Sequence, residues 1–298
     1  MKTVAILGPT ASGKTDLALD LAREHDAAIL SLDSLAIYRE IDIASAKPTL
    51  RERGAIPHFG IDLLFPDEHF SVGTFIGLYR EAAGYCRERE KHLIIVGGTG
   101  FYLKTLMEGI SEIPEISETV KSTVKKILID PQEAYEKIRR IDPDYAEKIK
   151  KGDRYRIEKA LQLHYETGLT PSRYFAEHPP VPIVTELPLF EIETDKTDLN
   201  ERIEKRTAQM IDRGLVDEVA RLEKKYGRAP NPMKAIGIVE VLDYFDGKLS
   251  FEEMREKIVI HTRQLAKRQR TFNTTQFPEH PKGSAEAIKN SISEIFEG

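Results

Sequence analysis

The sequence has one cysteine and no tryptophan, and none of its apolar runs approaches the length of a membrane span. The lone Cys86 excludes an internal disulfide and is typical of a reducing compartment, so we expect a cytoplasmic protein. The apolar run before Gly8 is too short for the core of a signal peptide. The eight histidines lack the spacing of a metal-ligand set. These absences argue against a secreted disulfide scaffold, a zinc protein and a membrane protein.

The chain does have enough apolar sequence for a core, since 40% of its 298 residues are hydrophobic. This length accommodates one large domain or two ordinary ones. The net charge of -5 by itself argues against nucleic-acid binding. Lysines and arginines nevertheless gather between about 114 and 188 and again in 263–270. Local basic clusters therefore leave RNA binding open.

The clearest motif lies at residues 8–15, which match the phosphate-loop pattern G-x-x-x-x-G-K-[ST]. An apolar run at 3–7 predicts a strand before it, and a leucine- and alanine-rich segment predicts a helix after it. This context argues against a chance match to a turn. We expect Lys14 to reach the outer phosphates and the Thr15 hydroxyl to hold Mg2+. The predicted diphosphate-binding residues are Gly8, Pro9, Thr10, Ala11, Ser12, Gly13, Lys14 and Thr15.

The rest of the chain alternates between strand and helix patterns. Strands are predicted at 28–32, 92–96 and 189–193, and helices at 71–90 and 199–213. This alternation predicts an α/β fold of the P-loop NTPase type, in which helices flank a parallel sheet. Less regular segments give a candidate strand at 58–64, a loop at 41–57, and helices at 232–245, from Ser250 to about 272, and at 285–296.

Besides the phosphate loop, the ends of two predicted strands have candidate functional residues. Asp33 follows the strand at 28–32, and ligands of parallel α/β sheets bind where strands end, so this carboxylate could accept a proton or bind metal-bound water. The alternative is an N-cap of the next turn, and both roles could hold. The strand at 92–96 ends in Gly97-Gly98-Thr99, where a P-loop ATPase usually has a Walker-B aspartate. The chain therefore looks equipped to bind a diphosphate without the usual hydrolysis machinery.

Basic residues mark two further regions. Residues 113–188 predict a helical insertion with a basic face between core segments 1–112 and 189–298, although interleaved glutamates also fit an ordinary solvated surface. Arg202 and Arg206 lie one helical turn apart and could clamp a diphosphate, or could pair with neighbouring glutamates. Four cations lie near the end of the last long helix: Arg263, Lys267, Arg268 and Arg270. They could bind a phosphate backbone, or they could belong to an ordinary solvated helix end.

Taken together, the motifs resemble those of the tRNA dimethylallyltransferases, also called tRNA isopentenyltransferases. The stretches that carry the resemblance are 8–15, Asp33-Ser34 with Ile37-Tyr38, Asp42-Ile43 with Ala46-Lys47-Pro48, 96–99 with Tyr102, Arg202 to Arg206 with Met210 and Gly214, Ala235-Ile236-Gly237, and Thr262 to Thr271. They follow the family's order over nearly the whole chain. Each is modest support alone, and the combination is highly specific.

The resemblance implies transfer of a dimethylallyl group from dimethylallyl diphosphate to N6 of adenosine 37, next to the anticodon, in tRNAs reading codons that begin with U. It implies Mg2+ as cofactor, the anticodon stem-loop as partner, a monomer and no membrane. Asp33 matches the family's general base, Arg206 matches a diphosphate-contacting arginine, and Thr99 belongs to the same centre. The residues expected to contact tRNA are Asp33, Ser34, Leu35, Ala36, Thr99, Lys121, Tyr155, Arg156, Ile157, Glu158, Lys159, Lys234, Ala235, Ile236 and Gly237, with Arg263 and Lys267 from the basic helix.

Three departures from the family's pattern bear on tRNA contact rather than on chemistry. Ile238 and Val239 replace a tyrosine and a basic residue, Phe272 replaces a tryptophan, and the segment 155–159 has lysine where arginine is common. Two other functions share some of the motifs. A P-loop kinase of a nucleoside or small metabolite would use the loop and Asp33 but would not need the basic insertion. A nucleotide-gated RNA-binding module would need turnover to reset, which the missing Walker-B carboxylate argues against.

Overall fold

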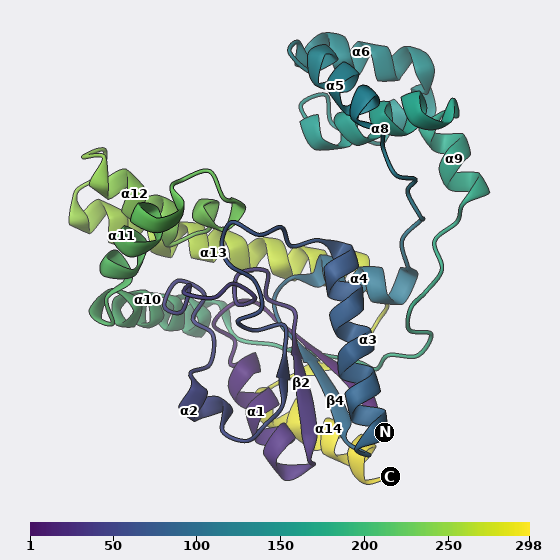
Figure 1. The fold of residues 1–298 in the computed structure, drawn as a ribbon. Coiled ribbons are helices and arrows are strands. Elements are labelled where there is room, and N and C mark those ends of the chain that lie inside the picture. Colours follow the sequence, from purple (N-terminus) through teal and green to yellow (C-terminus); the bar gives the residue numbers. More distant parts are fainter. The chain divides into compact units, whose positions relative to one another are not determined.

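The computed structural model describes residues 1–298, which form two compact units. The first, here called the sheet unit, contains residues 1–107 and 184–298. The second, the helical unit, contains residues 108–183 and is inserted between those two segments of sequence (Figure 1). No helix of the structure is both long enough and apolar enough to traverse a lipid bilayer.

The sheet unit is built on six parallel strands in the order β3-β2-β4-β1-β5-β6. The strands are β1 (Thr3–Leu7), β2 (Ala27–Ser31), β3 (His58–Phe59), β4 (His92–Val96), β5 (Leu189–Ile192) and β6 (Lys282–Gly283). Central β1 pairs with both β4 and β5, so that Ala5 lies between Ile95 and Leu189. The parallel α/β sheet predicted from the alternating pattern is confirmed.

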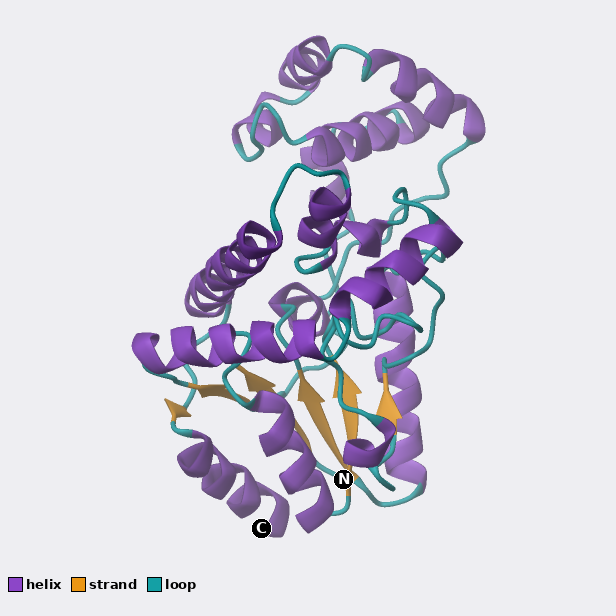
Figure 2. Ribbon diagram, turned by 90° about the vertical axis from the view of Figure 1, so that its left-hand side faces the viewer, coloured by secondary structure: helices purple, strands orange, loops and turns teal.

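Helices cover both faces of this sheet (Figure 2). One face buries apolar side chains of the strands, such as Ile6 and Ile94, under α1 (Lys14–Glu24) and α14 (Ala285–Glu297). On α3 (Val72–Glu88), which packs against β2 and β4, Phe75 and Leu78 are buried. Burying a side chain of this size contributes roughly 1.5–3 kcal/mol. Packing from both sides explains why the strands read as continuous apolar runs.

The sheet unit has further helices, most of them on the side where the strands end (Figure 2). They are α2 (Leu50–Arg53), α4 (Gly100–Glu108), α10 (Lys196–Asp212), α11 (Leu215–Tyr226), the short 3-10 helix η1 (Asn231–Lys234), α12 (Ile238–Phe245) and α13 (Phe251–Gln276). Ser250 and Glu253 form the expected capping box at the start of α13. Helix α13 packs against α10 and α12 along its length.

Three predictions about local structure are wrong in detail. The loop expected at 41–57 contains the short helix α2, whose first turn is held by a capping box of Thr49 and Glu52. The strand expected over 58–64 stops after two residues, because the chain turns at Gly60 with a φ of 77°. The helix expected over 232–245 is interrupted before Gly237, whose φ of 93° does not continue a helix.

The helical unit consists of five helices around a small core of its own. They are α5 (Glu118–Ile127), α6 (Pro131–Ile141), α7 (Pro143–Glu147), α8 (Arg154–Thr167) and α9 (Pro171–Glu177). Val124, Ile138 and Leu161 lie in this core. Asp130 caps α6 and Asp153 caps α8, as their positions before helical patterns predict.

Candidate active site at the carboxyl edge of the sheet

The phosphate loop, residues 8–15, connects β1 to α1. Gly13 precedes the helix with a φ of 92°, a conformation that a residue without a Cβ adopts at little cost. No hydrogen bond within the chain occupies the backbone N–H groups of Gly13, Lys14 and Thr15. These groups and the positive end of the helix dipole therefore form an anion-binding concavity.

Lys14 is the first residue of α1, and only 8% of it is exposed. Its ammonium donates a hydrogen bond to the carbonyl oxygen of Pro9 at 2.6 Å. Burial and, to a smaller extent, the Arg206 guanidinium together lower the pKa of Lys14 from 10.5 to about 7, although the Asp33 carboxylate acts in the opposite direction. A bound anion would favour the charged form of Lys14, so we expect this lysine to take up a proton when a phosphate ligand binds.

Asp33 lies two residues beyond the end of β2, on the same edge of the sheet. Its Oδ1 accepts hydrogen bonds from the backbone N–H groups of Leu35 at 2.8 Å and Ala36 at 3.1 Å. The predicted capping of the following turn is thereby confirmed. No hydrogen bond of the chain uses the second oxygen, Oδ2, and the residue lines the cavity described below. One carboxylate thus holds the turn and keeps an oxygen available.

Arg202 and Arg206 extend from α10 toward the phosphate loop, and both line the same cavity. Arg202 is exposed, and its Nη1 donates to the carbonyl oxygen of Ser12 at 3.5 Å. Arg206 is half-buried; burial lowers its pKa, and Asp33 partly offsets that shift. Neither arginine pairs with the neighbouring glutamates of α10. The two guanidinium groups therefore remain available to an anion.

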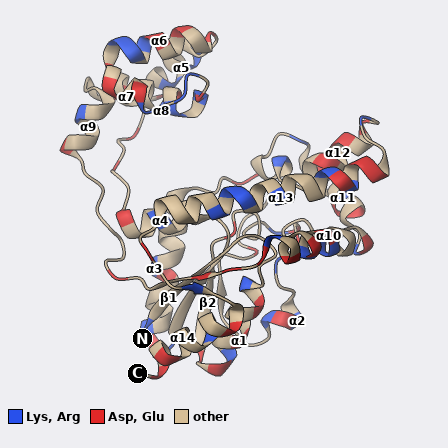
Figure 3. Cartoon of the chain, turned by 180° about the vertical axis from the view of Figure 1, so that it is seen from behind, with Lys and Arg blue, Asp and Glu red and all other residues tan.

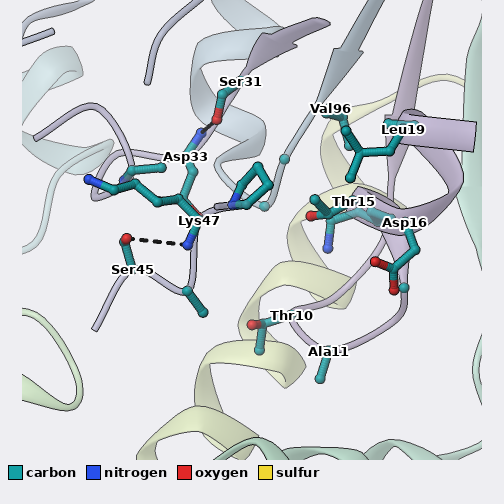
Figure 4. Close-up of a pocket in the computed structure, with 18 of the residues that line it drawn as sticks. Thr10, Ala11, Thr15, Asp16, Leu19, Ser31, Asp33, Ser45, Lys47 and Val96 are labelled. Carbon is teal, nitrogen blue, oxygen red and sulfur yellow. Dashed lines mark hydrogen bonds between the residues drawn. The ribbon is translucent and has the colours of Figure 1, made fainter. Parts of the chain in front are cut away.

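These groups surround a cavity of about 390 Å3. The close-up in Figure 4 shows Thr10 and Thr15 of the phosphate loop together with Asp33 among the residues that line it. Apolar side chains, including Ile61 and Met210, complete the lining. A cavity with an anion-binding floor and apolar walls suits a phosphorylated ligand that has a hydrocarbon part.

One wall of the cavity, residues 45–48, depends on a buried carboxylate from a distant helix. Glu218 of α11 is 2% exposed and accepts three backbone hydrogen bonds from residues 42, 43 and 44, at 3.0, 2.8 and 2.9 Å. Nothing in the local sequence of α11 distinguishes this glutamate from its exposed neighbours. The pairing joins residues about 175 positions apart, which is why the sequence did not reveal it.

Lys47 stabilises the same wall from within. Its ammonium pairs with Asp42 at 2.7 Å and Asp62 at 2.5 Å, and it donates to the carbonyl oxygen of Tyr38 at 2.8 Å. Arg53 also binds Asp62, at 2.7 Å. Every proton of this buried ammonium has a partner, so Lys47 fixes the shape of the wall.

The other residues expected at the site lie around the cavity to different extents. Ala36 lines it, whereas Ser34 is exposed beside it. Thr99 does not line the cavity, although the preceding residue, Gly98, does. The backbone N–H of Thr99 donates to the Leu32 carbonyl oxygen at 3.2 Å. Gln269 of α13 lines the cavity as well; the sequence placed it in the motif from Thr262 to Thr271 but assigned it no role.

The segment Lys234–Gly237 joins η1 to α12, with the Lys234 side chain exposed. Its end is fixed by Glu240, which accepts the backbone N–H of Gly237 at 2.6 Å and contacts His261 Nδ1 at 2.5 Å. Ala235 and Ile236 are half-buried. Lys234 is therefore the member of this segment that presents a charge to solvent.

The four cations of α13 differ in their surroundings. Arg263 pairs with Glu204 of α10, and Arg270 donates to the Thr194 carbonyl oxygen at 2.6 Å. Lys267 and Arg268 are exposed, and neither forms an ion pair. Figure 3 shows stretches of basic residues, in blue, along α13. Two of the four cations are thus free to meet an external anion.

The helical unit carries the remaining predicted contacts, Lys121 and residues 155–159. Lys121 and Lys159 border one groove of about 480 Å3 between α5 and α8. Tyr155 is 69% exposed, and the Lys159 ammonium lies 5.8 Å from the centre of its ring. Ile157 does not belong to this surface, because its side chain is fully buried in the core of the unit. Ile157 therefore supports the surface from beneath.

Mg2+ binding can be tested against the oxygen groups of the cavity. The exposed Thr15 hydroxyl and the Asp33 carboxylate both border it, whereas no cluster of three or more acidic, histidine or cysteine side chains could hold a metal on its own. Mg2+ keeps several waters and typically binds through one or two protein oxygens together with substrate phosphates. The donor set fits that mode of binding.

The sheet, the phosphate loop and the cavity together define a P-loop α/β protein that holds a phosphorylated ligand. Comparison with known proteins narrows this class. The model of the family described as IPP transferase matches residues 36–276, and that of isopentenyl transferase matches residues 1–55. The chain therefore belongs to the IPP transferase family.

Similar proteins and structures extend over nearly the whole chain. It is 52% identical over 293 residues to the tRNA dimethylallyltransferase of Sulfurovum sp., covering 98% of this chain and 97% of that relative. The enzyme of the same name from Sulfurimonas denitrificans is 51% identical, with 98% of each chain covered. The crystal structure of tRNA delta(2)-isopentenylpyrophosphate transferase from Staphylococcus epidermidis has a TM-score of 0.71 at 30% identity and covers 99% of this chain and 98% of its own. A eukaryotic dimethylallyltransferase acting on tRNA has a TM-score of 0.81 at 27% identity, over 92% of this chain and 70% of its own.

Proposed function

We propose that this protein transfers a dimethylallyl group from dimethylallyl diphosphate to N6 of adenosine 37, beside the anticodon, in tRNAs that read codons beginning with U. One observation carries the proposal: the phosphate loop, Arg206 and Asp33 line a single cavity with apolar walls. The diphosphate would bind the first two, and the prenyl group would lie against the walls. Family membership supports this reaction over phosphoryl transfer to a small acceptor.

The main task of the site is to stabilise the leaving group. The exocyclic amine of adenine is a weak nucleophile, so the bond from carbon to the diphosphate oxygen must be largely broken when N6 attacks. The loop N–H groups, Lys14 and Arg206 then stabilise the negative charge that develops on the departing diphosphate as it takes the electron pair of the broken bond. When bound through Thr15, Mg2+ supplies further positive charge to the diphosphate. Removing one such donor should cost on the order of 100-fold in rate.

Asp33 completes the reaction by accepting a proton. As the bond from N6 to the prenyl carbon forms, the amine becomes acidic, and Oδ2 of Asp33 takes the proton that N6 loses. Because Oδ1 is engaged by two backbone N–H groups, the carboxylate cannot easily rotate away. Proton acceptance of this kind contributes roughly 100- to 10,000-fold.

The tRNA would be held by exposed cations and aromatic rings of both units. A base inside a stacked loop cannot reach a cavity, so the adenine must leave its stack. We assign the anticodon stem-loop to the surface of Lys121, Tyr155, Arg156 and Lys159 and to Lys267 of α13, where solvated cations can neutralise phosphates. We propose a monomer as the working form, because the phosphate loop, Asp33 and Arg206 of a single chain already line one cavity.

One assay tests this proposal. The protein is mixed with Mg2+, labelled dimethylallyl diphosphate and unmodified tRNA, and the reaction is repeated with ATP in place of the prenyl donor. We expect label in tRNA, at the adenosine beside the anticodon, and no consumption of ATP. Consumption of ATP without labelled tRNA would replace the proposal with a small-molecule kinase. Binding of tRNA with neither reaction would replace it with an RNA-binding module.

A further inference from the structure

Gln269 of α13 connects two parts of the cavity that are far apart in sequence. Its Oε1 accepts the backbone N–H of Thr10, in the phosphate loop, at 2.7 Å. Its Nε2 donates to the carbonyl oxygen of Gly98, just beyond the end of β4, at 3.0 Å. The orientation of the amide is fixed by its partners, because only this orientation meets an N–H with oxygen and a carbonyl with nitrogen.

The turn after β4 is shaped to receive this amide. A Cβ at Gly98 would lie 2.2 Å from Nε2 of Gln269, so a side chain there would displace the amide. One turn further along α13, Asn273 donates to the buried Glu191 carboxylate of β5 at 2.7 Å. Helix α13 is thus joined to the phosphate loop and to the ends of β4 and β5 by two successive side chains.

Most side chains cannot make both of the bonds of Gln269. The position needs an acceptor for one backbone group and a donor for another, and a carboxylate, an ammonium or an apolar chain offers at most one of these. Asparagine has both but is shorter by one methylene. Without the bonds, the Thr10 N–H and the Gly98 carbonyl would each lose a half-buried partner, and the spacing between loop and turn would no longer be fixed.

We propose that Gln269 is a positioning residue, which holds the phosphate loop at a fixed distance from the end of β4 and so aligns the prenyl diphosphate with the incoming base. The inference rests on the proposed function. It goes beyond the proposed function because it gives a neutral side chain of α13 the task of aligning the substrates. Lys267, two residues earlier on the same helix, is exposed to solvent. A misplacement of about 1 Å at a reacting centre can cost on the order of 100-fold in rate.

Two variants test the inference from opposite sides of the contact. Gln269→Met keeps the length of the side chain and removes both hydrogen bonds. Gly98→Ala leaves Gln269 unchanged but pushes its amide away; Gly98 has no positive φ, so alanine fits its backbone. Gln264→Met, an exposed glutamine on the same helix with no hydrogen bond, serves as the control. For each, kcat, the KM values of both substrates, the affinity for inorganic pyrophosphate with Mg2+, and Tm are measured.

We expect Gln269→Met to lower kcat about 100-fold and to weaken pyrophosphate binding about tenfold, while the KM of tRNA stays within twofold. Gly98→Ala should behave similarly, and the double variant should be no worse than either single one, since both remove the same contact. Gln264→Met should match the wild-type protein. If Gln269→Met fails to fold, Gly98→Ala alone decides the question through the same measurements.

A wild-type kcat in either variant would overturn the proposal, as would fully additive effects in the double variant. A loss confined to the KM of tRNA would also overturn it, because the contact would then serve RNA binding. If the wild-type protein transferred no dimethylallyl group, the proposed function would fail, whereas the pyrophosphate affinities would still decide whether Gln269 shapes the phosphate loop.

Discussion

Two positive charges in the cavity of the sheet unit and two on the helical unit lie in opposite environments. In the sheet unit, Lys14 is buried and Arg206 half-buried, neither has a carboxylate in an ion pair, and burial lowers the pKa of both. In the helical unit, Lys121 and Arg156 are exposed and pair with acidic residues three positions away on the same helix or its cap. In Figure 3, acidic (red) and basic (blue) residues alternate along the helices of this unit.

The difference in burial determines how the cations of the cavity and those of the helical unit can act. A desolvated cation is costly until an anion arrives, and it then interacts strongly because water does not screen it. A solvated pair contributes roughly 0–1 kcal/mol and is readily exchanged for another partner. We therefore expect changes in the cavity to act mainly on kcat, and changes on the helical unit to act on binding and on its salt dependence.

The largest effect should come from Asp33→Asn. Asparagine retains an oxygen for the backbone N–H groups of Leu35 and Ala36 but cannot accept the proton of the amine. We expect kcat to fall roughly 100- to 10,000-fold while tRNA still binds. Asp33→Ala should be at least as inactive and should also lower Tm, because it removes the turn cap as well. Near-normal turnover in the asparagine variant would remove Asp33 from the proton transfer.

The next largest effect should come from Arg206→Met. We expect kcat to fall roughly 100- to 1,000-fold, because a half-buried donor to the leaving diphosphate is lost. Arg202→Met is the matched control one turn away, and we expect at most about a tenfold loss, since water screens this exposed guanidinium. Steady-state kinetics at saturating tRNA would measure both. Equal losses in the two variants would contradict the distinction between buried and exposed cations.

A smaller effect should appear in the pH dependence of binding. The pKa of Lys14 in the free protein is about 7, below its ordinary value of 10.5. A bound diphosphate raises that pKa, so binding above pH 7 takes up a proton, and affinity should fall about tenfold per pH unit until the pKa of the complex is reached. Calorimetry with dimethylallyl diphosphate from pH 7 to 9 would measure it.

Lys14→Met is the control for that experiment. We expect it to bind more weakly and to lose this part of the pH dependence. It should also be more stable at neutral pH, because a lysine whose folded pKa is depressed to about 7 destabilises the folded state most below that pH, and this cost disappears only as the pH rises toward the unfolded pKa. An affinity of the wild-type protein that stays constant over this pH range would contradict the assignment.

The smallest effects should come from the exposed cations. Lys267→Ala and Lys121→Ala should each weaken tRNA binding a few-fold at moderate salt and lower the slope of log affinity against log salt by roughly 0.7–0.9. Their kcat at saturating tRNA should be unchanged. Lys289→Ala, on α14 and paired with Glu24, is the control and should leave the slope unchanged. An unchanged slope for Lys267→Ala would exclude a phosphate contact there.

Much of the fold could be predicted from the sequence, because the strands are buried on both faces. The pattern of residues 92–96 predicted β4 with its observed bounds, and the capping box at Ser250 gave the start of α13. The phosphate loop could be recognised for a similar reason, since all of its geometry lies within eight consecutive residues and the strand and helix beside them.

The walls of the cavity could not be predicted, because they depend on contacts between distant residues. Glu218 has ordinary surroundings in the sequence, and the motif that contains Gln269 does not indicate what this side chain contacts. Their partners lie about 175 and 259 positions away. The break in the helix at Gly237 was missed because a glycine between apolar residues also fits a continuous helix pattern. Sequence reasoning thus finds groups whose neighbours in space are also neighbours in the chain.

The dependence of the cavity on Glu218 and Gln269 has a consequence for biosynthesis. In a growing chain that has been made only as far as β5, the strands β1 to β5 are present in the sequence, but α11 and α13 do not yet exist. The loop at 42–44 then lacks its carboxylate and Thr10 lacks its amide. We therefore expect a chain released early to keep the strands and the phosphate loop but to transfer no prenyl group. Only nearly complete molecules would then modify RNA.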